Sequence, residues 1–356
     1  MNVSDFDFEL PPELIAQEPP AVRGASRLLA VDRQTGARAH RRFRDLPELL
    51  RPGDLLVAND TSVFPARLLG RRLPGGGAVE CLLVAEEAPA TATAVEGVWS
   101  ALVHPGQRLK EGSRMEFPAD GPVAIEGEIL GRHFHGRRTV RLRTTGGGPL
   151  DEAIDRIGHV PLPPYIHRAD AAADRERYQT VFAHDRGSIA APTAGLHFTP
   201  ELLAALDARG VERTTVTLHV GYGTFQPIRV DRVEDHQMEA ERYIVSDATA
   251  AALTAARVEG RRIVAVGTTT TRTLESLNVA PDGTVEPGRG DTSLFIRPGH
   301  QFRLVTGLVT NFHLPRSSLL MLVSAFGGRE HILAAYRDAV AAGYRFYSYG
   351  DAMLIL

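Results

Sequence analysis

Apolar runs separated by helical patterns at both ends of the chain predict an α/β fold there. Near the start, residues 27–32 and 54–58 read as strands, with a short helix over residues 43–50 between them. The same alternation returns after about residue 150 and continues to the last residue. The further strands expected there cover residues 214–219, 262–266, 302–309 and 352–356, and helices are expected over 201–209, 247–259, after Pro315 and up to Ala342.

The middle of the chain has a different pattern. Between about residues 66 and 145, short runs of alternating apolar and polar residues are divided by Pro and Gly, as at 77–84, 98–103 and 139–143. Such runs are typical of a small β-barrel. We therefore predict an α/β main domain with an inserted small β-barrel domain. The predicted limits are residues 1–65 and 151–356 for a discontinuous α/β catalytic domain, and 66–150 for the barrel.

The composition agrees with two domains and excludes several classes of cofactor and catalytic site. The 356 residues are 43% hydrophobic and 23% charged, which suits an ordinary folded protein with more than one small core. Cys81 is the only cysteine, so disulfide frameworks, iron–sulfur clusters and cysteine-rich zinc sites are excluded. Lys110, the only lysine, lies in a turn-like segment, where neither a Walker A loop nor a Schiff-base lysine fits.

No targeting or membrane signal stands out. The first residues have no basic start followed by an apolar run, and no segment has about 18 uninterrupted apolar residues. We therefore expect a cytoplasmic protein that does not contact a membrane.

The charge of the chain bears on nucleic-acid binding. A formal net charge of −3 argues against a strongly basic nucleic-acid binder. Two local clusters of basic residues soften that objection: one with His133 and His135 among the arginines of residues 132–143, and one at residues 38–44. Each could be a solvated strand face or a surface that follows phosphates.

Polar residues follow three of the predicted strands, where open α/β sheets place their ligands. The strand at 54–58 is followed by Asn59, Asp60 and Thr61, and the strand at 262–266 runs into a glycine and a row of threonines that open a helix. The N–H groups and hydroxyls of Gly267, Thr268 and Thr269 could hold a carboxylate, ribose or phosphate, and Arg272 could add a bidentate anchor. A hydroxyl-rich helix cap is the alternative. At the end of the strand at 302–309, alternation puts Asn311 and His313 on one face and Phe312 on the other.

Two further histidines lie in segments rich in small residues. His197 comes two residues before a predicted helix N-cap, in a segment that also holds Thr193 and Gly195. A helix dipole there would lower the pKa of the imidazole, and a neutral histidine could act as a base or a hydrogen-bond donor. His219 opens a glycine-containing segment, residues 219–227, that would allow close approach to a ligand. A packing loop with a capped histidine is the alternative for His197.

Two acidic segments are weaker candidates. Asp291 could join the site, although an Asx turn explains it nearly as well. His236, Glu239 and Glu241 fit no zinc signature well, so we predict no metal and favour a carboxylate that acts as a base or binds a cation.

Several long segments, in order, nearly fill the chain and together resemble one family. They are ANDTSVFPAR at 58–67, GHVPLPPY at 158–165, AAPTAGLHF at 190–198, HVG at 219–221, GTT at 267–269, GDT at 290–292, LVTNFHLP at 308–315 and YRFYSYGD at 344–351. The chain resembles the S-adenosylmethionine:tRNA ribosyltransferase-isomerases of queuosine biosynthesis. Two departures are visible: Glu239 stands where similar enzymes usually have histidine, and Tyr222 where they usually have leucine.

The resemblance implies the substrates and the product. It implies a tRNA carrying 7-aminomethyl-7-deazaguanine at the wobble position, with S-adenosylmethionine as ribosyl donor rather than a permanently bound cofactor. It also implies an epoxyqueuosine product, released adenine and methionine, and a monomer with a barrel inserted in an α/β domain.

From the chemistry of these substrates we assign roles as hypotheses. His197 and His313 would carry the acid/base work, with His219 and Asp60 in reserve. The methionine end would bind to Arg272 and the turn at residues 267–269, and Arg67 with the basic barrel hairpin would meet tRNA phosphates. The remaining substrate-binding candidates are Asn59, Thr61, Thr193, Gly195, Asp291 and Asn311. An S-adenosylmethionine-dependent tRNA methyltransferase and a non-catalytic RNA-binding protein are the alternatives. The first usually has a Gly-rich turn after its first strand, which we do not find.

Overall fold

The computed structural model describes residues 1–87, 91, 93–118, 124–133, 136–221 and 228–356. The chain divides into two compact units. The α/β unit comprises Met1–Ser62, Pro164–Arg168 and Arg177–Leu356, and the barrel unit comprises Val63–Pro163 and Ala169–Glu176. The barrel unit is thus wider than residues 66–150, and our domain limits stay a prediction. The predicted fold class, an α/β domain with an inserted β-barrel, is confirmed.

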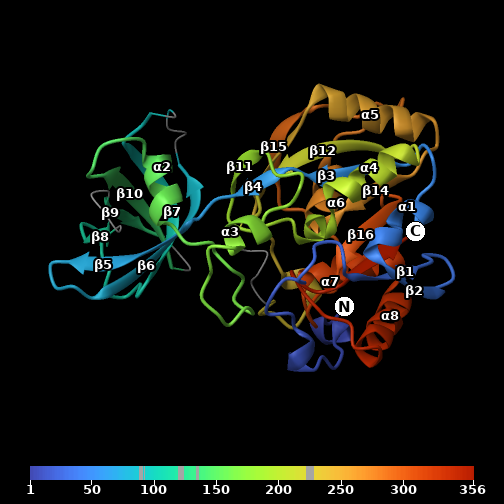
Figure 1. Ribbon diagram of the computed structural model, residues 1–356, viewed down its shortest axis with the longest axis horizontal. Coiled ribbons are helices and arrows are strands. Elements are labelled where there is room, and N and C mark those ends of the chain that lie inside the picture. Colours follow the sequence, from blue (N-terminus) through green and yellow to red (C-terminus); the bar gives the residue numbers. More distant parts are fainter. Residues whose placement is uncertain (88–90, 92, 119–123, 134–135, 222–227) are drawn as a thin grey trace. The chain divides into compact units, whose positions relative to one another are not determined.

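A mixed sheet is the framework of the α/β unit. In the described part of the chain it has nine strands, and β12, β3, β14 and β16 lie side by side and parallel (Figure 1). On one side of these four, β17 pairs antiparallel with β16, β1 is parallel to β17, and β2 is antiparallel to β1. The order is β15 (Gly288–Thr292), β13 (Glu241–Val245), β12 (Glu212–Leu218), β3 (Leu55–Asn59), β14 (Ile263–Val266), β16 (Gly307–Asn311), β17 (Ala352–Ile355), β1 (Arg27–Val31), β2 (Arg38–Arg42).

Helices between these strands contribute to the cores of the unit. Ser246 and Ser317 cap the helices that follow them, and Thr199 with Pro200 starts another, as the sequence predicts. The helices of this unit are α1 (Leu46–Leu49), α4 (Pro200–Ala208), α5 (Asp247–Val258), α6 (Gly267–Ser276), α7 (Ser318–Gly327) and α8 (Arg329–Ala341). The barrel unit holds α2 (Leu150–Ile157) and all but the last residue of α3 (Asp174–Arg177). No helix among the described residues is long and apolar enough to cross a membrane.

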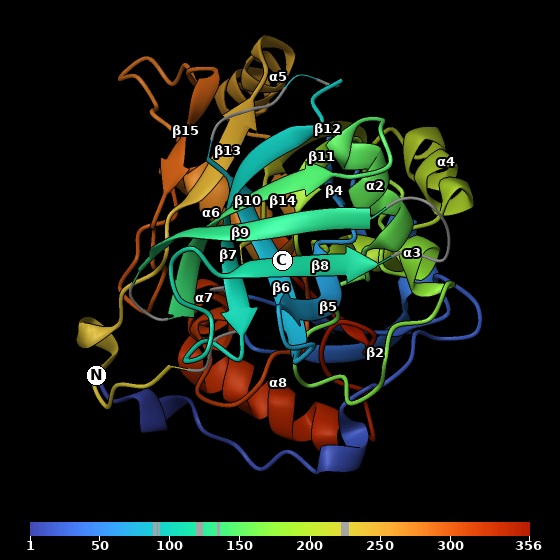
Figure 2. The ribbon, with the colours of Figure 1, turned by 90° about the vertical axis from the view of Figure 1, so that its left-hand side faces the viewer.

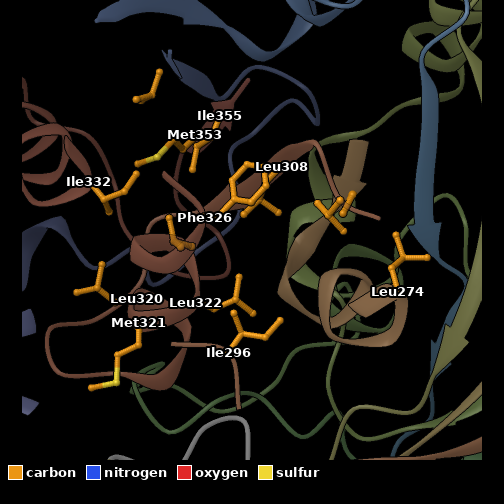
Figure 3. Close-up of a cluster of buried hydrophobic side chains, with 14 of the residues drawn as sticks. Leu274, Ile296, Leu308, Leu320, Met321, Leu322, Phe326, Ile332, Met353 and Ile355 are labelled. Carbon is orange, nitrogen blue, oxygen red and sulfur yellow. The ribbon is translucent and has the colours of Figure 1, made fainter. Parts of the chain in front are cut away.

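The larger core of the α/β unit joins helix α7 to the sheet. Figure 3 shows Leu320, Leu322 and Phe326 of α7 gathered near Leu308 of β16 and Met353 of β17. All five are fully or almost fully buried, and each such side chain stabilises the fold by about 1.5–3 kcal/mol of apolar transfer free energy. This packing fixes the strand end from which Asn311 and His313 emerge.

A closed barrel forms the second unit, and Figure 2 shows its strands β8 and β9 side by side. Leu83, Ala101, Ile129 and Val140 alternate with more exposed residues and are fully buried, which explains the period of two in the sequence. The barrel order is β10 (Arg137–Thr144), β7 (Glu96–His104), β6 (Ala78–Glu86), β5 (Arg67–Leu73), β8 (Arg114–Pro118), β9 (Ala124–Arg132). Strands β4 (Thr61–Val63) and β11 (Asp185–Ser188) are not part of the barrel and form a separate two-stranded sheet.

One predicted strand is wrong in part. We expected a strand over residues 302–309, but β16 begins only at Gly307. The backbone N–H groups of Arg303, Leu304 and Val305 donate instead to the buried carboxylate of Glu275, at 2.8–3.1 Å. Backbone groups bound in this way cannot join a ladder, so the apolar run stays irregular. Of the other candidate segments, His135 and residues 222–227 lie outside the described residues.

Candidate active site

The carboxyl ends of the four parallel strands bring the predicted polar segments to one edge of the sheet. Asn59 ends β3, His219 follows β12, Gly267 follows β14, and Asn311 ends β16. Segments more than 200 residues apart in sequence therefore meet at this edge. Their meeting follows from the parallel order, because the carboxyl ends of parallel neighbours share an edge.

A pocket lies at this edge, within the α/β unit. Together with the open solvent at its mouth it encloses about 560 Å³. Its lining comes from the ends of β14 and β16, from the segment before α4 and from the segment before β17. The lining residues are Tyr165, Ala191, Pro192, Thr193, Ala194, Val220, Gly267, Thr268, Thr269, Thr310, Asn311, His313, Leu319, Tyr347 and Ser348.

His313 is the histidine of this pocket. Its Nε2 lies 2.8 Å from the Thr310 hydroxyl, and its backbone N–H donates to the Tyr336 hydroxyl at 3.0 Å. Among the described residues, no side chain bonds its Nδ1. Burial lowers the pKa of His313 to about 3, so the imidazole is neutral near pH 7. In the tautomer whose Nε2–H donates to Thr310, the neutral ring presents an unprotonated Nδ1 that can accept a proton from a ligand.

His197 lies behind the pocket wall rather than on it. Its Nε2 accepts a hydrogen bond from the Asn311 amide at 3.0 Å, so its Nδ1–H donates to the Ser26 hydroxyl at 2.9 Å. Burial lowers the pKa of His197 to about 4, and its ring packs 4.9 Å from the Phe43 ring. We expected the helix dipole to lower this pKa, but burial is the main cause. Both nitrogens are occupied, so His197 positions Asn311.

Asn311 connects this recess to the pocket. Its amide donates to His197 and to the Tyr347 carbonyl at 3.1 Å, while its Oδ1 accepts from the Thr193 hydroxyl at 3.2 Å. Since the amide nitrogen has two acceptors, its orientation is fixed. The recess itself is lined by Pro19, Pro20, Arg23, Gly24, Ser26, Arg177, Leu196, His197, Ser348, Tyr349 and Gly350. Gly195 lines neither cavity; a Cβ there would meet Thr180 at 2.9 Å, so its role is packing.

The first turn of α6 forms another part of the pocket. No side chain caps this helix, so its first N–H groups keep their capacity to bind an anion. The hydroxyls of Thr270, Thr271 and Thr273 donate to carbonyls one turn earlier, at 2.8–3.1 Å. Thr268 and Thr269 are the members of this row that line the pocket. The predicted anion-binding turn therefore lies beside His313 and Asn311 in one cavity.

Arg272 lies one turn deeper and does not line the pocket. Its guanidinium pairs with the buried Glu241 carboxylate and donates to the carbonyls of Leu294 at 3.0 Å and Thr292 at 3.2 Å. Only 3% of the residue is exposed. Its donors are engaged with the protein, so we withdraw Arg272 as a ligand anchor. Glu241, which also accepts from the Gly221 N–H at 2.9 Å, is likewise part of this internal network.

A second polar cluster lies at the ends of β3 and β12. The Thr61 hydroxyl is 2.8 Å from His219 Nδ1, and the Thr217 hydroxyl donates to Asp60 at 2.7 Å and to Asp185 at 3.1 Å. Burial lowers the pKa of His219, and the charge of Asp185 partly opposes this shift. None of these residues lines the pocket.

Asn59 connects that cluster to the pocket. It donates to the Leu218 carbonyl at 2.9 Å and lies 3.5 Å from the Thr269 hydroxyl. Asn59 thus holds the ends of β3 and β12 next to the first turn of α6. Among the described residues, no group of three or more His, Cys, Asp or Glu could hold a metal ion.

Two predicted residues lie elsewhere. Arg67 is in the barrel strand β5, where it makes two hydrogen bonds of 2.9 Å to Glu80. Asp291 lies exposed in the edge strand β15.

Sequence reasoning missed the tyrosines of the pocket. Tyr165 and Tyr347 have ring centroids 3.7 Å apart, and the Tyr165 hydroxyl bonds the Ser348 hydroxyl. Tyr347 has φ 72°, a left-handed conformation that a bulky residue rarely adopts. Their segments, 158–165 and 344–351, were among those carrying the resemblance, and that signal could have pointed to them.

Comparisons with known proteins cover the whole chain. The family model described as queuosine biosynthesis protein matches residues 3–355. A protein of Anaeromyxobacter sp. (strain Fw109-5) is 55% identical over all of this chain and 99% of its own, and one of Heliobacterium modesticaldum is 51% identical over all of both. Both are named S-adenosylmethionine:tRNA ribosyltransferase-isomerase. A crystal structure of S-adenosylmethionine tRNA ribosyltransferase from Thermotoga maritima is 41% identical, covers 99% of this chain and 100% of its own, and has a TM-score of 0.55. This chain belongs to the queuosine biosynthesis protein family.

Proposed function

We propose that the chain is an S-adenosylmethionine:tRNA ribosyltransferase-isomerase, an enzyme of queuosine biosynthesis. The observation that carries this proposal is identity of 50% or more, over its full length, to proteins of that name. S-Adenosylmethionine is then a consumed substrate, and tRNA is the acceptor. The finer proposal is that the accepting base is 7-aminomethyl-7-deazaguanine at the wobble position and that the product is epoxyqueuosine.

The chemistry of the donor sets what the site must do. A sulfonium acidifies the adjacent C5′–H, so a positioned base can remove that proton and begin the expulsion of adenine. The adenine leaves with the glycosidic electron pair and takes up a proton. The aminomethyl nitrogen then forms the new bond to the sugar and gives up a proton. Methionine leaves when its sulfur takes the electrons of the C5′–S bond, and new bonds within the rearranging sugar, including the epoxide, replace the one that breaks. The site must therefore supply a base, a proton donor and anchors for methionine.

We propose His313 as the group that removes the proton from C5′. Its ring lines the pocket, it is neutral near pH 7, and Thr310 orients its Nε2 while Nδ1 has no partner among the described residues. The imidazolium formed in the first step could return its proton to the departing adenine.

We propose that the first turn of α6 holds the carboxylate of the methionine moiety. Its uncapped N–H groups and the hydroxyls of Thr268 and Thr269 are the support, since helix N-termini attract anions. Thr193 and Asn311, bonded to each other at 3.2 Å, also line the pocket and would contact the ligand. Asp60 and His219 remain candidates for a charged or proton-transfer role near Thr61, outside the pocket lining.

The test is a product analysis. Purified protein is mixed with S-adenosylmethionine and tRNA carrying 7-aminomethyl-7-deazaguanine, and the small molecules are separated and quantified. We expect adenine and methionine in equal amounts, with one modified base for each adenine. S-Adenosylhomocysteine without adenine would instead indicate a methyltransferase. Binding of tRNA that is unaffected by S-adenosylmethionine, with no turnover, would indicate a non-catalytic RNA-binding protein.

A further inference from the structure

A second concavity of the α/β unit is rich in arginine and lies on its outermost strand, β2. It encloses about 880 Å³, open solvent included, and we call it the edge groove. Its lining residues are Arg27, His40, Arg41, Arg42, Asp45, Ala342 and Tyr344. The sequence of β2, RAHRR, has no residue that is fully buried. A strand of this composition leaves its cations in solvent.

Two of these arginines have no carboxylate partner among the described residues. Arg41 donates only to the backbone carbonyl of His40, and Arg42 bonds Asp45 through its backbone N–H. The Asp45 carboxylate, the acid of the groove, is occupied by that N–H at 2.9 Å and lies 3.9 Å from Arg44. The side chains of Arg41 and Arg42 are both exposed, so their charge is available to a ligand.

The floor of the groove is ordered by its other members. Arg27 pairs with Asp351 and lies 4.1 Å from the centre of the Tyr344 ring, whose hydroxyl is 2.8 Å from His40 Nδ1. Tyr344 itself is buried, with 1% of its surface exposed. These contacts fix the shape of the groove, and they leave Arg41 and Arg42 as its free cations.

Strand register puts the groove on the same edge of the sheet as the pocket. Asn311 of β16 pairs with Ala352, Ala352 with Leu28, and Leu28 with Arg41, so all four lie in one row across the sheet. Three strand spacings separate Asn311 from Arg41, or about 14 Å of backbone. The segment from Tyr344 to Tyr347 joins groove and pocket within one stretch of chain. A polymer bound in the groove would thus pass close to the pocket.

We propose that the edge groove binds the phosphodiester backbone of the tRNA substrate through Arg41 and Arg42. This inference rests on the proposed function for the identity of the RNA. Charge on an edge strand also protects against aggregation, but protection requires neither a concavity nor alignment with the pocket. The net charge of −3 makes such a local cluster necessary, because phosphate binding depends on cations.

The arginines of the barrel serve as the matched comparison. Arg71 pairs with Glu116 at 3.0 Å, and Arg114 pairs with Glu126 at 3.3 Å. Their side chains are 56% and 62% exposed. Like the groove arginines they are charged and exposed, but each of them pairs with a carboxylate. A variant with Arg71→Gln and Arg114→Gln removes the same two charges.

The experiment measures binding of the tRNA substrate over a range of salt concentrations, without S-adenosylmethionine, and then steady-state kinetics. For Arg41→Gln with Arg42→Gln we expect Kd and the KM for tRNA to rise about tenfold or more. The slope of log K against log salt should become shallower by about 1.4–1.8, since each of the two lost phosphate contacts removes about 0.7–0.9. The KM for S-adenosylmethionine and kcat should stay within about twofold of wild type, and the barrel variant should bind tRNA like wild type.

Two results would overturn the proposal. One is an unchanged Kd and salt slope in the groove variant. The groove would then bind an acidic protein instead, or its charges would serve only to prevent aggregation through the edge strand. The other is an equal loss in the barrel variant, which would make the effect one of overall charge. Binding is measured without turnover, so a failure of the groove is distinguishable from a failure of the proposed activity, which adenine release reports.

Discussion

The pocket around His313 and the recess around His197 each contain a buried histidine with a lowered pKa, but the two rings differ in their hydrogen-bond partners. Both histidines are buried, and burial lowers the pKa of each, to about 3 and about 4. His197 has both nitrogens bonded to protein, whereas Nδ1 of His313 has no partner among the described residues. Burial and a low pKa therefore do not identify a catalytic histidine. A ring nitrogen without a protein partner, on a histidine that lines a pocket, is the better criterion.

The largest effect is expected from the pocket histidine. His313→Ala and His313→Gln should lower kcat by about 10²–10⁴, the usual contribution of a positioned base. Adenine release measures this, and binding of S-adenosylmethionine by calorimetry should change much less. Thermal melting controls for folding. Near-normal turnover in a folded His313→Gln variant would remove His313 from the chemistry.

The recess histidine should act through Asn311. His197→Ala and Asn311→Ala should each reduce stability by about 1–3 kcal/mol, because each leaves buried hydrogen-bonding groups unsatisfied, and each should lower kcat by roughly tenfold. The double variant should cost about as much as either single one, since contacting residues are not additive. The pH profile of kcat should keep its shape in His197→Ala. Full additivity, or a shifted profile, would contradict a positioning role.

In stability against pH the two histidines should behave alike. Both are neutral in the folded protein down to about pH 4 for His197 and about pH 3 for His313, while an unfolded histidine is protonated below about pH 6.5. Their contribution is fully present above pH 6.5 and is lost as the pH falls towards 4. At pH 5 the loss should be about 2 kcal/mol for each. Urea unfolding at pH 7 and pH 5 measures it. The difference in unfolding free energy between the two pH values should be about 2 kcal/mol smaller in His313→Gln than in wild type; a difference as large as that of wild type would refute the assignment.

The smallest effects come from the hydroxyls that hold the two rings. Thr310→Val removes the partner of His313 Nε2, and Ser26→Ala removes that of His197 Nδ1. We expect kcat to fall about three- to fivefold in the first variant and less than twofold in the second, since only the first ring takes part in proton transfer. The two variants are compared by adenine release under saturating substrates. If kcat fell more in Ser26→Ala than in Thr310→Val, His197 rather than His313 would be the histidine that takes part in proton transfer.

Local patterns predicted much of the fold. Apolar runs and caps gave most strands and helices of the α/β unit, because period and capping are local properties. Strand β2 was not predicted, because RAHRR has no alternation of apolar and polar residues. It forms a strand through its pairing with β1. The stretch before Gly307 is apolar enough for a strand, but the Glu275 carboxylate, far away in sequence, takes its backbone N–H groups.

The site was predictable in part for the same reason. Polar residues after buried strands identified Asn311, His313 and Thr268, which line one pocket. Nothing near Arg272 shows that its guanidinium meets Glu241, 31 positions away. The bonds that occupy His197 come from Ser26 and Asn311, 171 and 114 positions away. Whether a polar group faces a ligand or the protein is decided by such distant partners.

The left-handed backbone of Tyr347 has a consequence for engineering. A bulky residue held in this region costs roughly 1–3 kcal/mol, and glycine would relieve much of that cost. Its carbonyl is bound by Asn311 and by the Gly350 N–H, so the unfavourable geometry is enforced from two sides. A stabilisation programme that placed glycine here would relieve the conformational cost and lose the aromatic ring that packs against Tyr165. Position 347 is therefore one that thermostability screens should leave untouched.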